Sequence, residues 1–418
     1  MQSPQNQTQI PTLLPSLPPS SSPLLGLTPT SPPTVFADWV QLGSDVDGEA
    51  LEDESGISVS LSSDGTILAV GALRNDGAGI NAGHARVYSL LEGEWVRRGG
   101  DVEGEAAGDR FGMSVSLSSD GLVLAVGASE HDGTFGVGSG QVRVFDWNGT
   151  FWVARGRSID GQAAGDDFGV SVALSSDGTF VAAGAWSNDR GGSNAGQVRI
   201  FSWDRGSWLQ RGTGLDGESA NDWLGYSISL SSNGSVVAMG AHGNNDNGVD
   251  SGQARVFQWT GTAWSQLGPN INGLNANDEF GGYVSLSGDG TVVAIGAHVG
   301  NYCRVYGFDG DDWVGRGQIL QGEAGGDWFG FSVALSLNGN TVVIGAPLND
   351  DNGANSGHAR VYRFTPARWV QVGKSLVGES SGDRFGWSVA ISDDATRVAI
   401  GGPRNRGSTG HVRVYELM

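Results

Sequence analysis

Residues 109–128, DRFGMSVSLSSDGLVLAVGA, decide the fold because close copies of this stretch recur until the chain ends. A tryptophan precedes each copy, and successive tryptophans are 56, 57, 56, 56, 49 and 56 residues apart. Seven units of nearly one length indicate a repeat architecture. The seven tryptophans are Trp39, Trp95, Trp152, Trp208, Trp264, Trp313 and Trp369.

Two charged residues recur once in every unit. An aspartate stands two residues before the Phe-Gly position: Asp53, Asp109, Asp166, Asp222, Asp278, Asp327 and Asp383. An arginine precedes Val or Ile further along: Arg86, Arg143, Arg199, Arg255, Arg304, Arg360 and Arg413. Their shared occurrence predicts a structural role. Either the two side chains form a hydrogen-bonded or ionic link that fixes the loops, or the aspartate accepts backbone N–H groups in a turn.

The second unit shows how each repeat is built. Apolar residues alternate with serine over residues 113–118, which predicts a first strand, called strand A. An Asp-Gly turn leads to strand B at residues 122–128, strand C covers residues 141–147, and strand D starts at Trp152. Four antiparallel strands in each of seven units, with no helical period, predict an all-β, seven-bladed β-propeller.

The two ends of the repeat region complement each other. The last unit stops at residues 412–417, its strand C, and lacks a strand D. The first unit begins with a surplus strand D at residues 39–43. We expect these segments to pair in antiparallel fashion, so that the N-terminal strand completes the seventh blade and closes a monomeric ring.

Composition separates a leader from the ring. Residues 1–36 are rich in Pro and Ser and are predicted to be a disordered leader, whereas residues 37–418 form the predicted propeller. The leader has neither the basic start nor the unbroken apolar segment of a secretory signal. No apolar run reaches the roughly 20 residues of a membrane helix, so we expect no membrane insertion by this chain.

The net charge limits the classes of partner. A formal charge of −21 repels phosphate backbones, so nucleic acid is not an expected partner. The single cysteine, Cys303, excludes a disulfide within the chain and a metal site made of cysteines.

The recurring Phe-Gly and Gly-Ala pairs resemble the FG-GAP repeat of integrin α-subunit propellers and of related bacterial and algal surface proteins. The resemblance covers residues 39–418 and is clearest at Phe111-Gly112 with Gly127-Ala128, and at Phe329-Gly330 with the Gly-Ala-Pro that starts at Gly345. It implies a non-catalytic, extracellular or cell-surface binding and adhesion scaffold. Its protein or glycan partner would bind the face that carries the D-to-A and B-to-C loops.

The turns that hold calcium in this family depart from its pattern here. Family members with calcium place a DxDxDG cage in the A-to-B loop, whereas these turns read SSDG, SSNG, SGDG, SLNG or SDDA. One such hairpin cannot supply six ligand oxygens. The sequence therefore does not predict calcium at the family's usual position, and it identifies no other cofactor with certainty. The alternative is calcium in the B-to-C loops, with these candidate ligands: Asp246, Asp250, Asp350 and Asp351.

Loop length singles out one sector of the ring. From the Gly of Gly-Ala to the repeated arginine most units span 15 or 16 residues, but the fifth spans 8 and the seventh 12. These short loops predict a notch over blades five to seven, where arginines receive a carboxylate. The candidate partner-binding residues are Asn349, Asp350, Asp351, Arg404 and Arg406; the alternative is that these loops are simply solvated.

Catalysis is the second hypothesis. Propellers can host hydrolases or lyases with a site at the channel mouth, and strongly differing channel residues would favour that function. The strands here are nearly uniform, which favours a scaffold, so we do not expect an enzyme. His84, His358 and His411 occupy a position that holds Gln in other units, and we interpret them as packing or turn residues.

Overall fold

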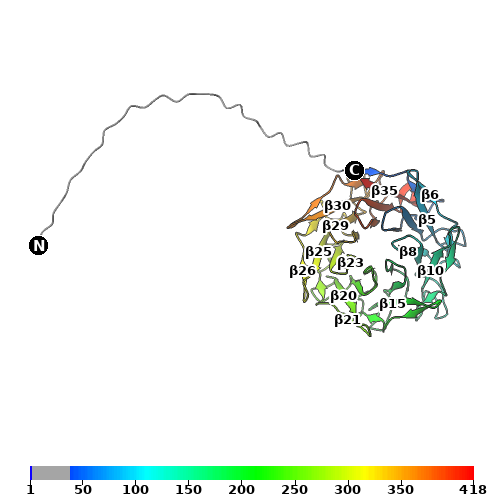
Figure 1. Cartoon of the computed structure of the whole chain (residues 1–418), viewed down its shortest axis with the longest axis horizontal. Coiled ribbons are helices and arrows are strands. Elements are labelled where there is room, and N and C mark those ends of the chain that lie inside the picture. Colours follow the sequence, from blue (N-terminus) through cyan, green and yellow to red (C-terminus); the bar gives the residue numbers. More distant parts are fainter. Residues whose placement is uncertain (2–37) are drawn as a thin grey trace, which may run out of the picture. The chain divides into compact units, whose positions relative to one another are not determined.

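Residues 38–418 form seven antiparallel sheets around a central channel (Figure 1). This computed structural model describes Met1 and residues 38–418. Apart from Met1, the predicted leader at residues 1–36 lies outside the described residues. The seven-bladed, nearly all-β architecture predicted from the repeats is confirmed.

Every blade has four strands, A to D, which are ordered from the channel to the outer edge. The innermost A strands are β3 (Ser58–Leu61), β8 (Phe111–Leu117), β13 (Val172–Leu174), β18 (Ile228–Leu230), β23 (Phe280–Leu286), β28 (Ser332–Leu335) and β33 (Ser388–Ile391). The B strands are β4 (Ile67–Ala72), β9 (Val123–Ala128), β14 (Phe180–Ala185), β19 (Val236–Ala241), β24 (Val292–Ala297), β29 (Thr341–Ala346) and β34 (Arg397–Gly402). The C strands are β5 (His84–Leu91), β10 (Gln141–Trp147), β15 (Gln197–Asp204), β20 (Gln253–Trp259), β25 (Tyr302–Phe308), β30 (His358–Thr365) and β35 (His411–Leu417).

The outer edge of each blade is divided into two segments that pair with the same C strand. The D strands are β6 (Glu94–Arg97), β11 (Trp152–Ala154), β16 (Ser207–Gln210), β21 (Trp264–Gln266), β26 (Trp313–Gly315), β31 (Arg368–Gln371) and β1 (Trp39–Gln41). Two-residue strands continue them: β7 (Val102–Glu103), β12 (Ile159–Asp160), β17 (Leu215–Asp216), β22 (Ile271–Asn272), β27 (Leu320–Gln321), β32 (Leu376–Val377) and β2 (Val46–Asp47).

The ring closes where the two ends of the repeat region meet. Strand β1 pairs with β35 in antiparallel register, with Trp39 opposite Leu417 and Gln41 opposite Tyr415. Strand β2 pairs with the start of β35, where Val46 lies opposite Val412. The predicted closure is confirmed, and the seventh blade is built from both ends of the ring.

The structure differs from the predicted elements in two details. Strand β8 starts at Phe111, two residues earlier than predicted, because a bulge between Phe111 and Ser114 lets the Phe-Gly pair join the sheet. A four-residue helix, α1 (Asn405–Ser408), interrupts the B-to-C loop of the seventh blade. This loop turns tightly at Gly407, whose φ is 73°.

The core lies between neighbouring blades. One cluster joins Ile67 and Val87 of the first blade to Val115 and Leu124 of the second, around the fully buried Phe111. Side chains that alternate along a strand reach both faces of a blade, and each face is covered by a neighbour. Packing between blades therefore explains the pattern of apolar and small residues in the repeats.

The recurring Gly-Ala glycine is explained by its contact with the next blade. A Cβ on Gly127 would overlap the carbonyl oxygen of Gly169, which belongs to the Phe-Gly pair of the following blade. Ser114 Oγ donates a hydrogen bond of 2.9 Å to the same carbonyl. The Phe-Gly and Gly-Ala pairs are thus two sides of one contact between blades.

The seven tryptophans connect each blade to the preceding one. In every blade the indole Nε1 donates to a backbone carbonyl of its neighbour; for example, Trp208 bonds the oxygen of Arg155 at 2.9 Å. At the closure Trp39 donates to the oxygen of Val372, also at 2.9 Å. The acceptors for the other five are Leu42, Arg98, Arg211, Leu267 and Arg316.

The seven repeated aspartates accept hydrogen bonds from backbone N–H groups. Each is at most 6% exposed, and each accepts the N–H of the residue three positions earlier; Asp383, for example, accepts from Ser380 at 2.8 Å. The corresponding contact joins Asp222 to the N–H of Ser219 at 2.9 Å. Of the two sequence-based alternatives, the structure shows the aspartate turn.

Asp222→Asn is expected to lower the stability of the ring by about 1–3 kcal/mol without changing its response to calcium. One carboxylate oxygen of Asp222 faces the N–H groups of Glu218 and Ser219, and the other faces the side-chain amide of Asn244. An amide at position 222 must point its NH₂ group at one of these donors. Urea unfolding of both proteins, with and without calcium, measures the effect; an unchanged midpoint would contradict this role.

The repeated arginines do not bind the repeated aspartates. Within residues 38–418 none of these arginines forms an ion pair with one of those aspartates. Arg86, Arg143, Arg255 and Arg360 pair instead with the glutamate of the Gly-Glu sequence in their own D-to-A loop. The arginine guanidinium also reaches the preceding blade, as where Arg199 bonds the oxygen of Asp160 at 2.6 Å. In these four blades the glutamate holds the loop, and the direct link between the repeated arginine and aspartate is wrong.

Candidate binding site at the wide mouth of the channel

The two ends of the channel differ in width. The end beside the A-to-B turns holds a cavity of about 150 Å³ lined mainly by leucine and serine. Backbone hydrogen bonds of 2.7–2.9 Å connect successive blades there, for example from Ser119 N to Ser176 O. The opposite end, beside the D-to-A and B-to-C loops, holds a cavity of about 390 Å³. We call this end the wide mouth.

Seven residues with unusual φ occupy equivalent positions in the D-to-A loops beside the wide mouth, and two of them, Glu54 and Arg110, line its cavity. They stand between the repeated aspartate and the Phe-Gly position and have φ between 52° and 60°: Glu54, Arg110, Asp167, Trp223, Glu279, Trp328 and Arg384. We call this set the mouth ring. Such φ values favour Gly or Asn, and bulky side chains adopt them at a cost. The Glu, Arg and Trp side chains at these positions therefore point to a role beyond the turn.

Aromatic side chains form a continuous arc over blades three to seven. It comprises Trp186, Trp223, Tyr226, His242, Tyr283, His298, Trp328, Phe331 and Trp387 and is called the aromatic arc. The ring centroids of Tyr226 and Tyr283 are 5.9 Å apart, and those of Phe331 and Trp387 are 4.4 Å apart. Burial lowers the pKa of His242 to about 4, so its imidazole is neutral at pH 7.

Arginines gather over the remaining part of the mouth. Arg404 Nη2 lies 3.0 Å from the buried Glu54 carboxylate, and Arg74 Nε lies 3.6 Å from the same oxygen. Arg110 pairs with Glu130 at 2.8 Å, while the Arg384 guanidinium lies 5.6 Å from the Trp387 ring. We call Arg74, Arg110, Arg384 and Arg404 the arginine sector. Four arginines around two glutamates give this sector a positive balance in a chain of net charge −21.

Members of both groups line the same cavity. Arg74, Arg110 and Glu54 share its wall with Tyr226, Tyr283 and Trp387. A ligand in this mouth meets cationic groups on one side and aromatic rings on the other. The arrangement suits a molecule that carries an acidic group and an apolar or sugar face.

The predicted notch residues lie in three separate environments. Asn349 is buried and donates to Asp327 at 3.0 Å, while Asp350 accepts from the N–H of Asn355 at 2.7 Å within the same loop. Asp351 lies 3.2 Å from His358 Nδ1. Arg404 joins the arginine sector, whereas Arg406 pairs with Asp47 at 2.8 Å. Across the described ring, no hydrogen bond or ion pair joins residues 349–351 to either arginine.

The four candidate calcium ligands are not brought together either. Asp246 accepts from the side chain of Gln253 at 2.9 Å, and Asp250 lies in its own loop with φ of 47°. Of the four, Asp351 alone belongs to a three-residue group that could hold a metal, in the part of the chain that the structure describes. In the A-to-B turns, carboxylates such as Asp64 are bonded to their own turn, here to Ser62 at 2.7 Å.

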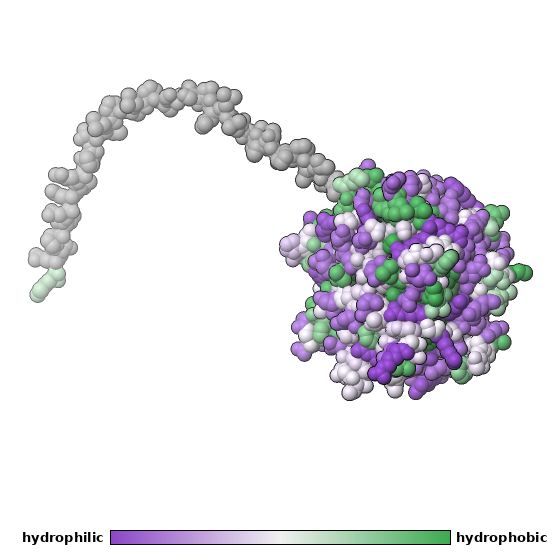
Figure 2. All heavy atoms as spheres, turned by 45° about the vertical axis from the view of Figure 1, so that its right-hand side comes forward, coloured by the Kyte–Doolittle hydropathy of each residue, from purple (hydrophilic) through white to green (hydrophobic). Residues whose placement is uncertain are grey.

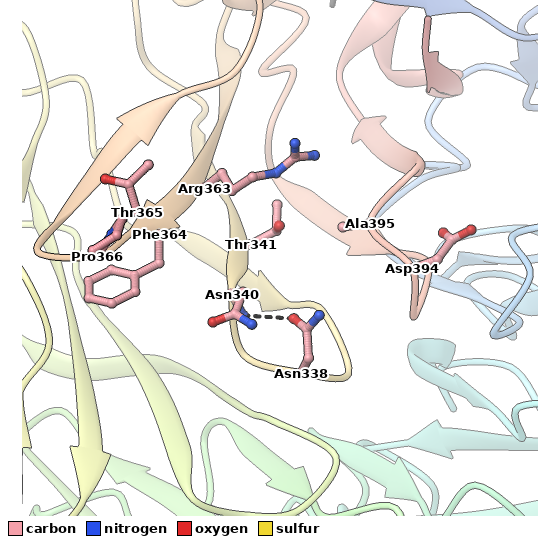
Figure 3. A pocket seen from close by; sticks show the side chains of 9 residues that line it. All are labelled: Asn338, Asn340, Thr341, Arg363, Phe364, Thr365, Pro366, Asp394 and Ala395. Carbon is pink, nitrogen blue, oxygen red and sulfur yellow. Dashed lines mark hydrogen bonds between the residues drawn. The ribbon is translucent and has the colours of Figure 1, made fainter.

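A second depression lies between blades six and seven on the side of the A-to-B turns, with a volume of about 500 Å³ (Figure 3). Its side chains come from three turns and the adjoining ends of β29 and β30, and Asn338 Oδ1 accepts the N–H of Asn340 at 2.9 Å. Asp394 is likewise bonded to Ser392 and to Thr396 within its turn. These polar groups stabilise their own turns, so this depression is a weaker candidate.

The comparisons with known proteins agree with the fold. Residues 103–145, 159–201 and 321–362 match the FG-GAP repeat family. The chain is an FG-GAP repeat β-propeller protein. A solved structure similar to this FG-GAP protein is the β-propeller domain of Cps50 (Swd1) from Myceliophteria thermophila. It is 12% identical, with a TM-score of 0.57, and the match covers 91% of this chain and 98% of that one, which shows the fold alone. Among proteins with curated descriptions, no sequence matches this chain.

The FG-GAP propeller is consistent with a binding scaffold, and FG-GAP repeats are typical of extracellular proteins. Among the described residues, no helix has the length and apolar character needed to cross a membrane. The face seen in Figure 2 is mainly hydrophilic, with small separate apolar areas. The variable residues of the wide mouth were missed at the sequence level. Their signal is the change from Ile57, Met113 and Val170 to Tyr226, Phe331 and Trp387 at the residue that follows the glycine of the Phe-Gly position.

Proposed function

We propose that this chain is a non-catalytic extracellular binding module, of the integrin-α-like adhesion type, that recognises a protein or glycan partner at the wide mouth. The mouth ring carries this proposal. Its seven residues occupy equivalent strained positions, yet their side chains differ from blade to blade while the scaffold residues around them repeat. Backbone strain that persists in this way is typical of functional surfaces.

The two sides of the mouth suggest how the partner is held. Arginine side chains in the arginine sector remain 39–41% exposed in Arg74, Arg110 and Arg404, so they can bind a carboxylate or sulfate. The aromatic arc offers rings such as Trp387, on which a sugar or an apolar side chain can stack. An acidic glycan or an acidic peptide loop therefore fits the mouth.

Charge reversal at the mouth tests this function. We expect the double substitution Arg74→Glu and Arg110→Glu to weaken partner binding about tenfold or more, because two cationic contacts are replaced by repulsion. The partner is first identified on arrays of acidic glycans and from cell-surface extracts, and its affinity is then measured by surface plasmon resonance.

The matched control changes the same charge away from the mouth. Arg157→Glu with Arg205→Glu alters two exposed arginines of the outer rim, and Arg205 has a 92% exposed side chain. We expect the control protein to bind like the original. Equal affinity in all three proteins would show that the partner does not use the wide mouth.

One observation favours an enzyme as the second candidate. Glu279 Oε2 lies 3.1 Å from Nε2 of His298, a member of the aromatic arc whose ring centroid is 5.5 Å from that of Phe331. The hydrogen bond from His298 lowers the pKa of Glu279, which stays ionised as a partner for the imidazole. A hydrolase or lyase would release products from polysaccharides on prolonged incubation, and His298→Ala would abolish that release. Absence of products favours the binding module.

A further inference from the structure

Three blades share a cluster of one histidine and two carboxylates. The histidine is the first residue of strand C, and one ligand atom from each side chain lies within 4.8 Å of the others. The clusters are Glu49, His84 and Asp101 in blade one; Glu323, Asp351 and His358 in blade six; and Asp45, Glu379 and His411 in blade seven.

In blades one and six the repeated arginine already neutralises the carboxylates. Arg86 pairs with both Glu49 and Asp101. Arg360 pairs with Glu323, and His358 Nδ1 is hydrogen-bonded to Asp351 at 3.2 Å. A cation in either cluster would have to displace a guanidinium group.

Blade seven differs because its arginine is directed elsewhere. Arg413 donates to the backbone oxygen of Val377 at 2.9 Å and lies over the Phe385 ring at 4.3 Å. Five units carry a glutamate in the Gly-Glu position, and in four of them the repeated arginine pairs with it. In the fifth, Glu379 is exposed and forms no ion pair with any residue of the described chain.

His411 is fully buried and has no well-formed hydrogen bond among the described residues. Its side chain is 0% exposed, and both ring nitrogens lack a hydrogen-bond partner among the described residues. A buried polar group left in this way costs free energy, so a native site normally supplies a partner. His411 Nδ1 lies 3.5 Å from Asp45 Oδ2, too long for a good hydrogen bond.

The same distance fits two ligands of one metal ion. Zinc bonds of about 2.0–2.2 Å at tetrahedral angles place neighbouring ligand atoms about 3.4 Å apart. We propose that Asp45, Glu379 and His411 bind a zinc ion, with water as the fourth ligand. Two carboxylates balance the dication, and Gln41 Nε2 holds the other oxygen of Asp45 at 2.7 Å as an outer partner.

The ion would join the two ends of the ring. Asp45 lies between β1 and β2, His411 starts β35, and Glu379 follows β32 in the D-to-A loop. Zinc at this place therefore stabilises the closure, independently of any partner at the wide mouth. Calcium does not fit, because it is bound by oxygen ligands and not by imidazole nitrogen.

Metal titration of the full chain tests the site. After removal of metals with a chelator, we expect one zinc ion to bind per chain by calorimetry, and cobalt(II) to show the visible absorption of a tetrahedral site. Zinc at one hundred times its Kd should raise the Tm by roughly 3 °C. The same concentration of calcium should leave the Tm unchanged.

Two substitutions to glutamine separate this cluster from its equivalents. His411→Gln should abolish zinc binding and the Tm shift, whereas His84→Gln in blade one should retain both. Glutamine occupies this position naturally in blades two, three and four, so both proteins should fold. If His411→Gln does not fold, the exposed ligand is replaced instead. Glu379→Gln should then bind zinc at least tenfold more weakly than the original protein. Absence of zinc binding in the original protein, or equal binding in these variants, overturns the proposal.

Discussion

Gly240→Ala is expected to lower the free energy of unfolding by about 3 kcal/mol or more, or to prevent the ring from folding. Gly240 has ordinary strand geometry, so the effect is steric and does not come from a special φ. A Cβ at this position would overlap the carbonyl oxygen of Gly281 in the next blade. Both partners are backbone in packed sheets, and neither can move without shifting a whole blade.

Gly307→Ala is the matched control. Gly307 lies in strand β25, has no positive φ, and a Cβ there would meet nothing within 4 Å. This change should alter stability by about 0.5 kcal/mol or less, or stabilise the ring slightly. Chemical unfolding of the two proteins measures the contrast. Similar midpoints would mean that the Gly-Ala contact does not hold the blades together.

The repeat fixes most of the fold before any coordinates are known. Strand C at residues 141–147 was predicted with the bounds that β10 has, because apolar alternation ends there at an Asn-Gly turn. The pairing of residues 39–43 with the last strand followed from counting the strands of the terminal units. Apolar periodicity predicts the start of strand A two residues too late, because a bulge at Phe-Gly has no signature in that periodicity.

The candidate site could be predicted only in part. Nothing in the residue types of Glu54, Arg110 or Trp328 indicates a left-handed conformation, so the mouth ring was invisible at the sequence level. Arg404 was singled out by its charge, but its partner Glu54 is 350 residues away in the sequence. Arg406 was grouped with it and instead pairs with Asp47 across the closure. Contacts across the closure form only when the ring is complete, so they cannot be predicted from the local sequence.

Deletion of residues 1–43, which removes β1, is expected to lower the Tm by about 5 °C or more and to promote association between chains. The outer edge of β35 would lose its ladder with residues 39–41 and the backbone bonds from Asp38 and Leu42. Trp39 is 8% exposed in the intact ring, and the loss of such a side chain alone costs about 3–5 kcal/mol. The unpaired edge then offers a template for a second chain.

Deletion of residues 1–36 is the control, since it leaves every pair of the closure in place. Its Tm should equal that of the full chain, and gel filtration should show a monomer, whereas the longer deletion should elute partly as larger species. The two deletions differ by seven residues, so a contrast between them assigns the effect to the closing strand. If both proteins melt together with the full chain, the ring does not depend on its closure. The stability of each blade would then come from its packing on its neighbours, as in an open repeat array.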